Sequence, residues 1–147
     1  LSPLMIVCID TNVVMGMFSR TAPWLRLRQG LLAGEFVWAL SNEILLEYEE
    51  IATREMSPAH GAQIGLFIEL ARQSRGCIQL ITPEFRFQTI PHDADDDKFA
   101  DCAICAHADF VITLDKHFQP MKGSGYKPQP ITPEEFISRF LKPLGTP

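Results

Sequence analysis

The sequence predicts a three-layer α/β/α fold, in which helices cover both faces of a mostly parallel central sheet of four to five strands. Short, continuously apolar segments rich in β-branched residues recur along the chain, and helical patterns separate them. The length of 147 residues and the 46% hydrophobic content suit a single core. We therefore expect one domain over residues 5–141, preceded by an extension over residues 1–4 and followed by a C-terminal tail over residues 142–147.

Four apolar segments are the predicted strands. A strand that is buried on both faces of a parallel sheet is apolar at nearly every position, and these segments have that pattern. They are Met5–Ile9, Phe36–Leu40, Cys77–Ile81 and Phe110–Thr113. The first strand is followed directly by Asp10, and sheets of this kind bind ligands beyond the carboxyl ends of their strands.

The helices are predicted from their capping residues and from apolar positions at helical spacing. Ser41 and Ser57 are typical N-cap residues, and Thr132 opens a capping box with proline at the first helical position. The expected helices occupy Asn42–Ala52, a segment that begins after Ser57, a segment from about Asp96 to His107, and a segment that begins after Thr132. The element order becomes βαβααβαβ followed by a last helix, an alternation typical of a parallel sheet covered on both faces.

Charge and hydropathy exclude some classes of protein. The chain has 13 Lys and Arg residues against 18 Asp and Glu residues, a formal net charge of −5, whereas general electrostatic clamps on nucleic acid are usually basic. Seven of the carboxylates fall between Asp93 and Asp115, and a cluster of that kind either is solvated or binds cations. No apolar segment reaches the ~20 residues of a bilayer-spanning helix. We expect a cytoplasmic protein.

The four cysteines are too few for a disulfide framework in a chain of this length. Cys102 and Cys105 form a C-x-x-C pair, but the pair lies inside a helical pattern and no second pair completes a zinc site. Reduced thiols are therefore expected.

Six carboxylates follow the predicted strands or lie near the start of a helix that follows one. Two pairs of them are four residues apart on a helix, where like charges repel, and a bound cation would offset that repulsion. Oxygen ligands without a coherent set of histidines and cysteines favour Mg²⁺ or Mn²⁺ over zinc. These acids are Asp10, the pair Glu43 and Glu47, the pair Asp97 and Asp101, and Asp115.

Several of the chain's acids also have a purely structural interpretation. Asp10 alone is equally consistent with a residue that caps a turn, and Glu43, Glu49 and Glu50 are consistent with a solvated helix face. Asp93, Asp95 and Asp96 are consistent with turn residues and with charges that favour a helix N-terminus. A site is favoured by the coincidence of separate acids at one edge of the predicted sheet.

Several segments, spread over nearly the whole chain, carry a resemblance to a known family. They are Ile9–Asn12, Ser41 followed six residues later by Glu47, Asp97–Ala103, Val111–Asp115 and Ile131–Phe136. Together they closely resemble the PIN-domain ribonucleases. The acidic segment Asp93–Ala103 and the closing segment are similar to bacterial PIN proteins that are toxins of toxin–antitoxin pairs, a broad relation of the VapC toxins.

The resemblance implies an endoribonuclease that uses Mg²⁺ or Mn²⁺, with an antitoxin protein as partner and a homodimer as assembly. The acids implied for catalysis and metal binding are Asp10, Glu47, Asp97 and Asp115, with Asp101 as a fifth metal ligand. The polar supports implied at the same edge are Asn12 and Thr113, and Glu43 is spaced to share the site with Glu47. Single-stranded RNA is the expected substrate, because an open carboxylate edge reaches a flexible backbone more readily than a rigid duplex.

Basic and histidine residues near the acids are candidates for secondary roles. RNA phosphates could contact Arg20, Arg26 and Arg28 after the first acid, or Lys116 and then Lys122 and Lys127 after the last one, although a solvated surface is the commoner role. His92 and His117 flank the acidic segment and are candidate auxiliary groups.

Two other functions remain open on the sequence. A non-catalytic PIN-like module would keep the acids for metal or partner binding, and metal-dependent cleavage of single-stranded RNA would distinguish it from a nuclease. A phosphatase or phosphotransfer domain of the haloacid dehalogenase type also has an aspartate after its first strand. That type needs a second aspartate two residues later, where this chain has Asn12.

Overall fold

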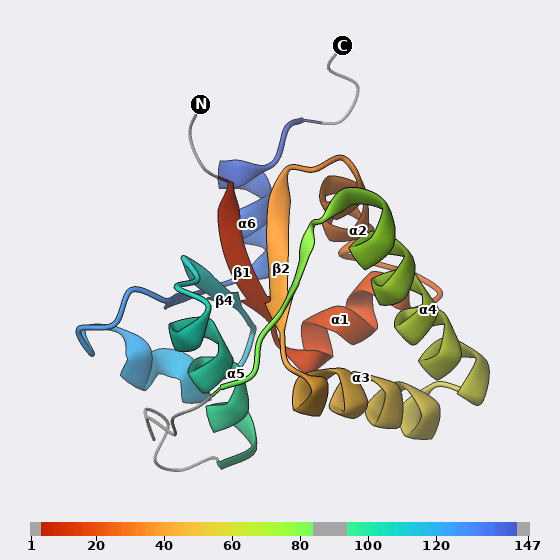
Figure 1. Ribbon diagram of the computed structural model, residues 1–147, viewed down its shortest axis with the longest axis horizontal. Helices are drawn as coiled ribbons and strands as arrows, with labels where there is room; N and C mark the ends of the chain where they lie inside the picture. The colour runs from red at the N-terminus through yellow and green to blue at the C-terminus, as the bar shows by residue number, and fades with distance from the viewer. Residues whose placement is uncertain (1–3, 84–93, 144–147) are drawn as a thin grey trace.

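The computed structural model describes residues 4–83 and 94–143 (Figure 1). Five strands form one parallel sheet in the order β3-β2-β1-β4-β5. The strands are β1 (Met5–Ile9), β2 (Phe36–Leu40), β3 (Ile78–Leu80), β4 (Phe110–Ile112) and β5 (Gln129–Ile131). The predicted α/β class and the parallel sheet of four to five strands are confirmed.

Six α-helices and one 3₁₀ helix, η1, connect and follow the strands in the described residues. They are α1 (Thr11–Phe18), α2 (Leu25–Leu32), α3 (Asn42–Glu55), α4 (Pro58–Arg75), α5 (Ala94–Cys105), η1 (Lys116–Met121) and α6 (Pro133–Phe140). Figure 1 shows α3 and α4 lying beside each other away from β1. The predicted caps are present: Ser41 accepts from the N–H of Ile44 at 3.2 Å, and Thr132 from that of Glu135 at 3.1 Å.

The register of the strands assigns the helices to two layers. Val7 and Phe110 are register partners and therefore share one face of the sheet, where the ring of Phe110 lies 6.3 Å from that of Phe136 in α6. Cys8 points to the opposite face, where its thiol is hydrogen-bonded with Cys102 of α5. The sheet is thus the middle layer between α5 and α6, as predicted.

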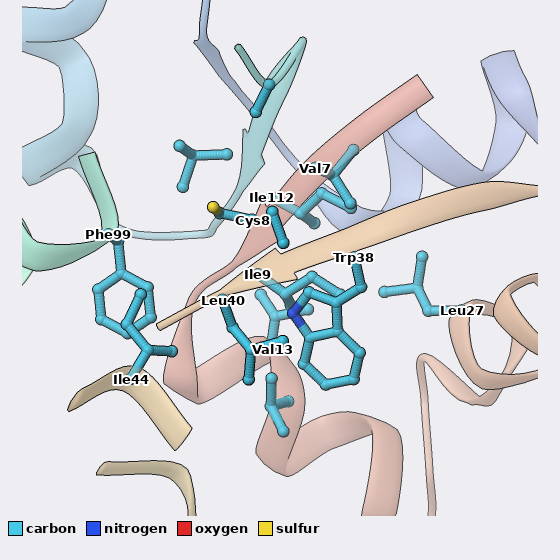
Figure 2. Packing of buried hydrophobic residues seen from close by; sticks show 14 of the residues in the cluster. Val7, Cys8, Ile9, Val13, Leu27, Trp38, Leu40, Ile44, Phe99 and Ile112 are labelled. Atoms are coloured by element: carbon cyan, nitrogen blue, oxygen red, sulfur yellow. The ribbon is translucent and has the colours of Figure 1, made fainter. Parts of the chain in front are cut away.

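The hydrophobic core is centred on β1 and β2. Figure 2 shows the Trp38 indole of β2 between Val13 and Leu27, which belong to α1 and α2. All three side chains are fully buried. Because β1 and β2 are covered on both faces, their carboxyl ends are held rigidly with respect to α1 and α3.

The state of the cysteines and the length of the helices bear on the expectations from composition. All four cysteines are free thiols, and the hydrogen bond that the Cys8 thiol makes to Cys102, together with burial, raises the pKa of Cys8 well above its usual value. Among the described residues, no helix combines the length and apolar character needed to cross a membrane.

Candidate active site

Asp10 lies at the junction between β1 and α1 and is 95% buried, with 5% of its surface exposed. Its backbone N–H donates to the carbonyl of Ile112 at 2.9 Å, which ties the end of β1 to the end of β4. One carboxylate oxygen accepts from the N–H of Thr11 at 2.8 Å, and the other accepts from the Thr113 hydroxyl at 2.8 Å. The residue is the N-cap of α1, so the capping interpretation is correct and does not exclude a site.

The hydroxyl groups of Tyr48 and Thr113 fix the same junction. The buried Tyr48 hydroxyl donates to the carbonyl of Ile9, the residue before Asp10, and burial raises the pKa of Tyr48 well above its usual value. The Thr113 hydroxyl, besides donating to Asp10, accepts from the N–H of Asp115 at 2.9 Å. Thr113 therefore couples the positions of the two acids.

Glu47 projects from α3, which begins directly after β2. The Thr11 hydroxyl donates to one of its carboxylate oxygens, and the ammonium of Lys98 in α5 forms an ion pair with the other. Sequence reasoning missed Thr11 and Lys98. A lysine beside acids on a helix is common on solvated faces, so its spacing gave no signal of a contact with α3.

An open pocket of about 180 Å³ brings three of the four principal acids together. It is lined by Asp10, Thr11, Asn12, Glu47, Ile51, Glu55 and Asp115. The acids come from the ends of β1 and β4 and from α3, as the argument from strand ends predicts. Glu55 was not predicted, although its spacing of eight residues from Glu47 puts both on one face of α3.

The remaining predicted acids do not line this pocket. Asp97 is half-buried on α5, one residue before Lys98, which pairs with Glu47. Asp101 is fully buried one helical turn later. Glu43 lines a different pocket with Ser41 and Ile81, on the side of β3.

The surroundings of Asp10 disfavour its charge. Burial, the largest effect, raises the pKa of Asp10 from its ordinary value of 3.8 to about 6. Hydrogen bonds from Thr113 and Thr11 oppose this rise, and the neighbouring charges of Asp115 and Glu47 add to it. The carboxylate therefore lies where a cation would be favourable.

The donor chemistry fits a hard divalent cation, because the acids that line the pocket offer only oxygen ligands. Within residues 4–83 and 94–143, however, no three Asp, Glu, His or Cys side chains already lie close enough to enclose an ion. The side chains that fit Mg²⁺ or Mn²⁺ would thus have to draw together around it.

The predicted basic residues do not form one surface. Arg26 forms an ion pair with Glu35 at 2.9 Å and donates to the carbonyl of Lys142 at 2.7 Å. Glu35 directly precedes β2, so Arg26 lies at the amino end of the sheet, away from the acid pocket. The guanidinium of Arg28 lies 4.4 Å from the centre of the Phe18 ring. Arg20 is exposed.

Lys116 directly follows Asp115 and lines a pocket different from the acid pocket. A second pocket, of about 160 Å³, is lined by Asp115, which also lines the first pocket, and by Thr113, Lys116 and Lys122. The backbone N–H of His117 donates to Asp115 at 2.9 Å, and its ring nitrogen lies 3.4 Å from the same oxygen. His92 and Asp93 lie outside the described residues.

The PIN domain family model matches residues 6–117, which include the acid pocket and both helices that carry Glu47 and Asp97. The chain belongs to the PIN domain family. PIN domains are generally nucleases, and PIN nucleases generally use divalent metal ions. This family assignment agrees with the resemblance carried by the sequence motifs.

A solved structure shares the fold of this PIN domain. A chain from the crystal structure of VapBC2 from Rickettsia felis, bound to a DNA fragment from their promoter, is similar with a TM-score of 0.57 and 15% sequence identity. The similarity covers 86% of this chain and 98% of that chain. No curated protein matched the sequence.

Proposed function

We propose that this PIN domain is an endoribonuclease that requires Mg²⁺ or Mn²⁺ and hydrolyses phosphodiester bonds of single-stranded RNA. The observation that carries the proposal is the convergence of Asp10, Glu47 and Asp115, from three separate elements, on one open pocket. Asp97, next to Lys98 on α5, is the proposed fourth catalytic acid and metal ligand. Asp101 is the proposed fifth ligand.

The proposed ion would be held by the carboxylates of Asp10, Glu47, Asp97 and Asp115. When bound, such an ion neutralises charge at the phosphate and activates water, so that no protein nucleophile is required. Thr113 keeps Asp10 and Asp115 in fixed relation, and the Thr11 hydroxyl orients Glu47. Asn12, on the exposed rim of the pocket, is placed to contact substrate.

The proposed path of the RNA runs over the cations that adjoin the acids. Lys116 and Lys122 are exposed in the pocket that shares Asp115, so they can contact phosphates next to the scissile one. Arg20 is the exposed arginine of the group after α1. Arg26 and Arg28 make the internal contacts described above, and these contacts would have to break before either residue could bind phosphate.

The decisive experiment is cleavage of end-labelled RNA by purified protein. We expect cleavage of a single-stranded oligonucleotide with Mg²⁺ or Mn²⁺, none with EDTA, and much slower cleavage of the matching duplex. Asp97→Asn should abolish cleavage while it preserves the circular dichroism spectrum, because loss of a ligand charge harms ion binding more than the core. Retained cleavage by Asp97→Asn would remove Asp97 from the site, and RNA binding without cleavage by the wild type would favour a non-catalytic module.

The proposed biological role is the toxin of a toxin–antitoxin pair, with a homodimer as its assembly. The VapBC2 complex, whose structure shares this fold, supports that role, as do the acidic motif and the closing segment of the sequence. Induced expression in a bacterial host should arrest growth, and Asp97→Asn should not. Light scattering of the purified chain would test the dimer. Unimpaired growth with active, soluble protein would contradict the toxin role but not the nuclease activity.

A further inference from the structure

A lysine pairs with one of the acids that line the pocket. The ammonium of Lys98 forms an ion pair with one oxygen of Glu47, and the Thr11 hydroxyl donates to the other oxygen. Both oxygens of this carboxylate are thereby engaged by protein donors. A metal ion that binds the oxygen facing Lys98 would have to compete with the ammonium for its charge.

The ion pair is well shielded from solvent. The side chain of Lys98 is 11% exposed and that of Glu47 is 22% exposed, in contrast to the surface pair of Arg54 and Glu55, at 62% and 57%. A pair at this depth is weakly screened by salt. It also joins α5 to α3, the two helices that carry Asp97 and Glu47.

The position of Lys98 on α5 surrounds its charge with acids. Asp97 precedes it directly, and the buried Asp101 lies three residues further on, which puts Asp101 near the same helix face. Across the pocket, Glu47 adjoins Asp10 and Asp115. A positive charge at this place lowers the mutual repulsion of the carboxylates while no ion is bound.

We propose that Lys98 is a resident counter-cation of the acid pocket, and that its ammonium and the divalent ion compete for Glu47. The ion binds to molecules in which the ammonium has left Glu47, and bound ion keeps the ammonium displaced. This inference rests on the metal site of the proposed function but does not require that the protein cleave RNA. It assigns to Lys98 a positioning role, since the residue holds Glu47 in place before the ion arrives.

Competition predicts how strongly Lys98 weakens metal binding. When only a fraction of molecules is competent to bind, the apparent affinity falls by that fraction, so a pair formed in ~90% of molecules weakens binding ~10-fold.

Titration calorimetry with Mn²⁺ alone tests the proposal. We expect Lys98→Met to lower the dissociation constant about tenfold. Lys116→Met is the matched control, because Lys116 lies next to Asp115 but does not contact Glu47. It removes the same charge from the same edge, and we expect it to change the constant less than about threefold, by the general electrostatic effect alone. An equal or weaker affinity of folded Lys98→Met, or an equal gain in both variants, would overturn the proposal.

A second measurement uses the wild-type protein and so does not depend on the stability of a variant. The Lys98 amine should react slowly with an acylating reagent in EDTA and severalfold faster at saturating Mn²⁺, as followed by mass spectrometry of the peptides. Lys127 forms an ion pair with Asp109, with 3.2 Å between the two charged groups, and neither residue lines the acid pocket. Lys127 should therefore react equally in both conditions. Unchanged labelling of Lys98 at saturation would overturn the competition. If the wild-type protein does not cleave RNA but the metal ion still displaces Lys98, only the proposed function would be contradicted.

Discussion

Replacement of Asp10 by asparagine should stabilise the metal-free protein at neutral pH. The substitution keeps the size of a side chain that is almost completely buried and removes only its charge. Burial raises the pKa of Asp10 to about 6, so the charged form is disfavoured in the folded state relative to the unfolded chain. The ion of the proposed function would offset this cost when bound.

The size of the effect follows from the pKa shift. One pKa unit corresponds to about 1.4 kcal/mol, so a rise from 3.8 to about 6 corresponds to a cost of about 3 kcal/mol at neutral pH. Asparagine retains one acceptor oxygen, so one of the hydrogen bonds from Thr11 and Thr113 is lost, at about 1 kcal/mol. The net expectation for Asp10→Asn is a gain of about 2 kcal/mol.

The sign of the pH dependence follows from the same shift. Below pH 3.8 the carboxyl group is protonated in both states and costs nothing, and above about pH 6 it is charged in both. The stability that the wild type derives from protonated Asp10 is therefore lost as pH rises through about 6. The advantage of Asp10→Asn should grow from pH 4 to pH 6 and then remain constant.

Urea denaturation in EDTA at several pH values, followed by circular dichroism, measures the difference between the two proteins. Saturating Mn²⁺ should reverse the order at pH 7.5, because binding to the native state stabilises only a protein that retains its ligands. A lower stability of Asp10→Asn than of wild type at pH 7.5 in EDTA would refute the reasoning. It would mean that the hydrogen bonds to the carboxylate outweigh the burial of its charge.

Two further expectations concern the supports of the fold and the site. Thr113→Val removes the hydroxyl that joins Asp10 to Asp115, so it should lower stability by about 1–3 kcal/mol and weaken Mn²⁺ binding, as measured by urea denaturation and calorimetry. Burial alone would raise the pKa of Glu35. Hydrogen bonds from the Lys142 N–H and from Arg26 outweigh burial, so that the pKa of Glu35 is lowered overall. Glu35→Gln should therefore be less stable than wild type at pH 7, and the difference should vanish at acid pH, where protonated Glu35 loses the same advantage.

The parts of the fold that sequence reasoning predicted are those with strong local signals. The continuous apolar run of β1 and the side-chain cap at Ser41 fix their elements almost alone. By contrast, α2 begins at Leu25 after Trp24, an N-cap residue that makes no side-chain cap, and the separation of α2 from α1 was not predicted. The edge strand β5 has three residues and contains Pro130, so its pairing with β4 depends on tertiary position more than on sequence pattern.

The same division holds for the site. The convergence of Asp10 and Asp115 was predictable because both follow neighbouring parallel strands, whose ends must meet at one edge. The pairing of Lys98 with Glu47 was not predictable, because it joins two helices that are distant in the sequence and leaves no periodic signal. The internal contacts of Arg26 and Arg28 have the same origin, and they divide a basic group that looks continuous along the chain.

These contacts imply an order of events at the acid pocket. Without a divalent ion, the pocket presents carboxylates whose nearest described counter-charge, Lys98, is directed to Glu47 and is largely buried. The exposed cations, Lys116 and Lys122, flank only one side of Asp115, so an RNA phosphate that approaches the pocket meets negative charge. An ion that displaces Lys98 would neutralise the acids. It would also release a second positive charge, the Lys98 ammonium, beside them. For the proposed ribonuclease we therefore expect metal binding to precede productive RNA binding, which would make the acidic net charge of the chain compatible with a nucleic-acid substrate.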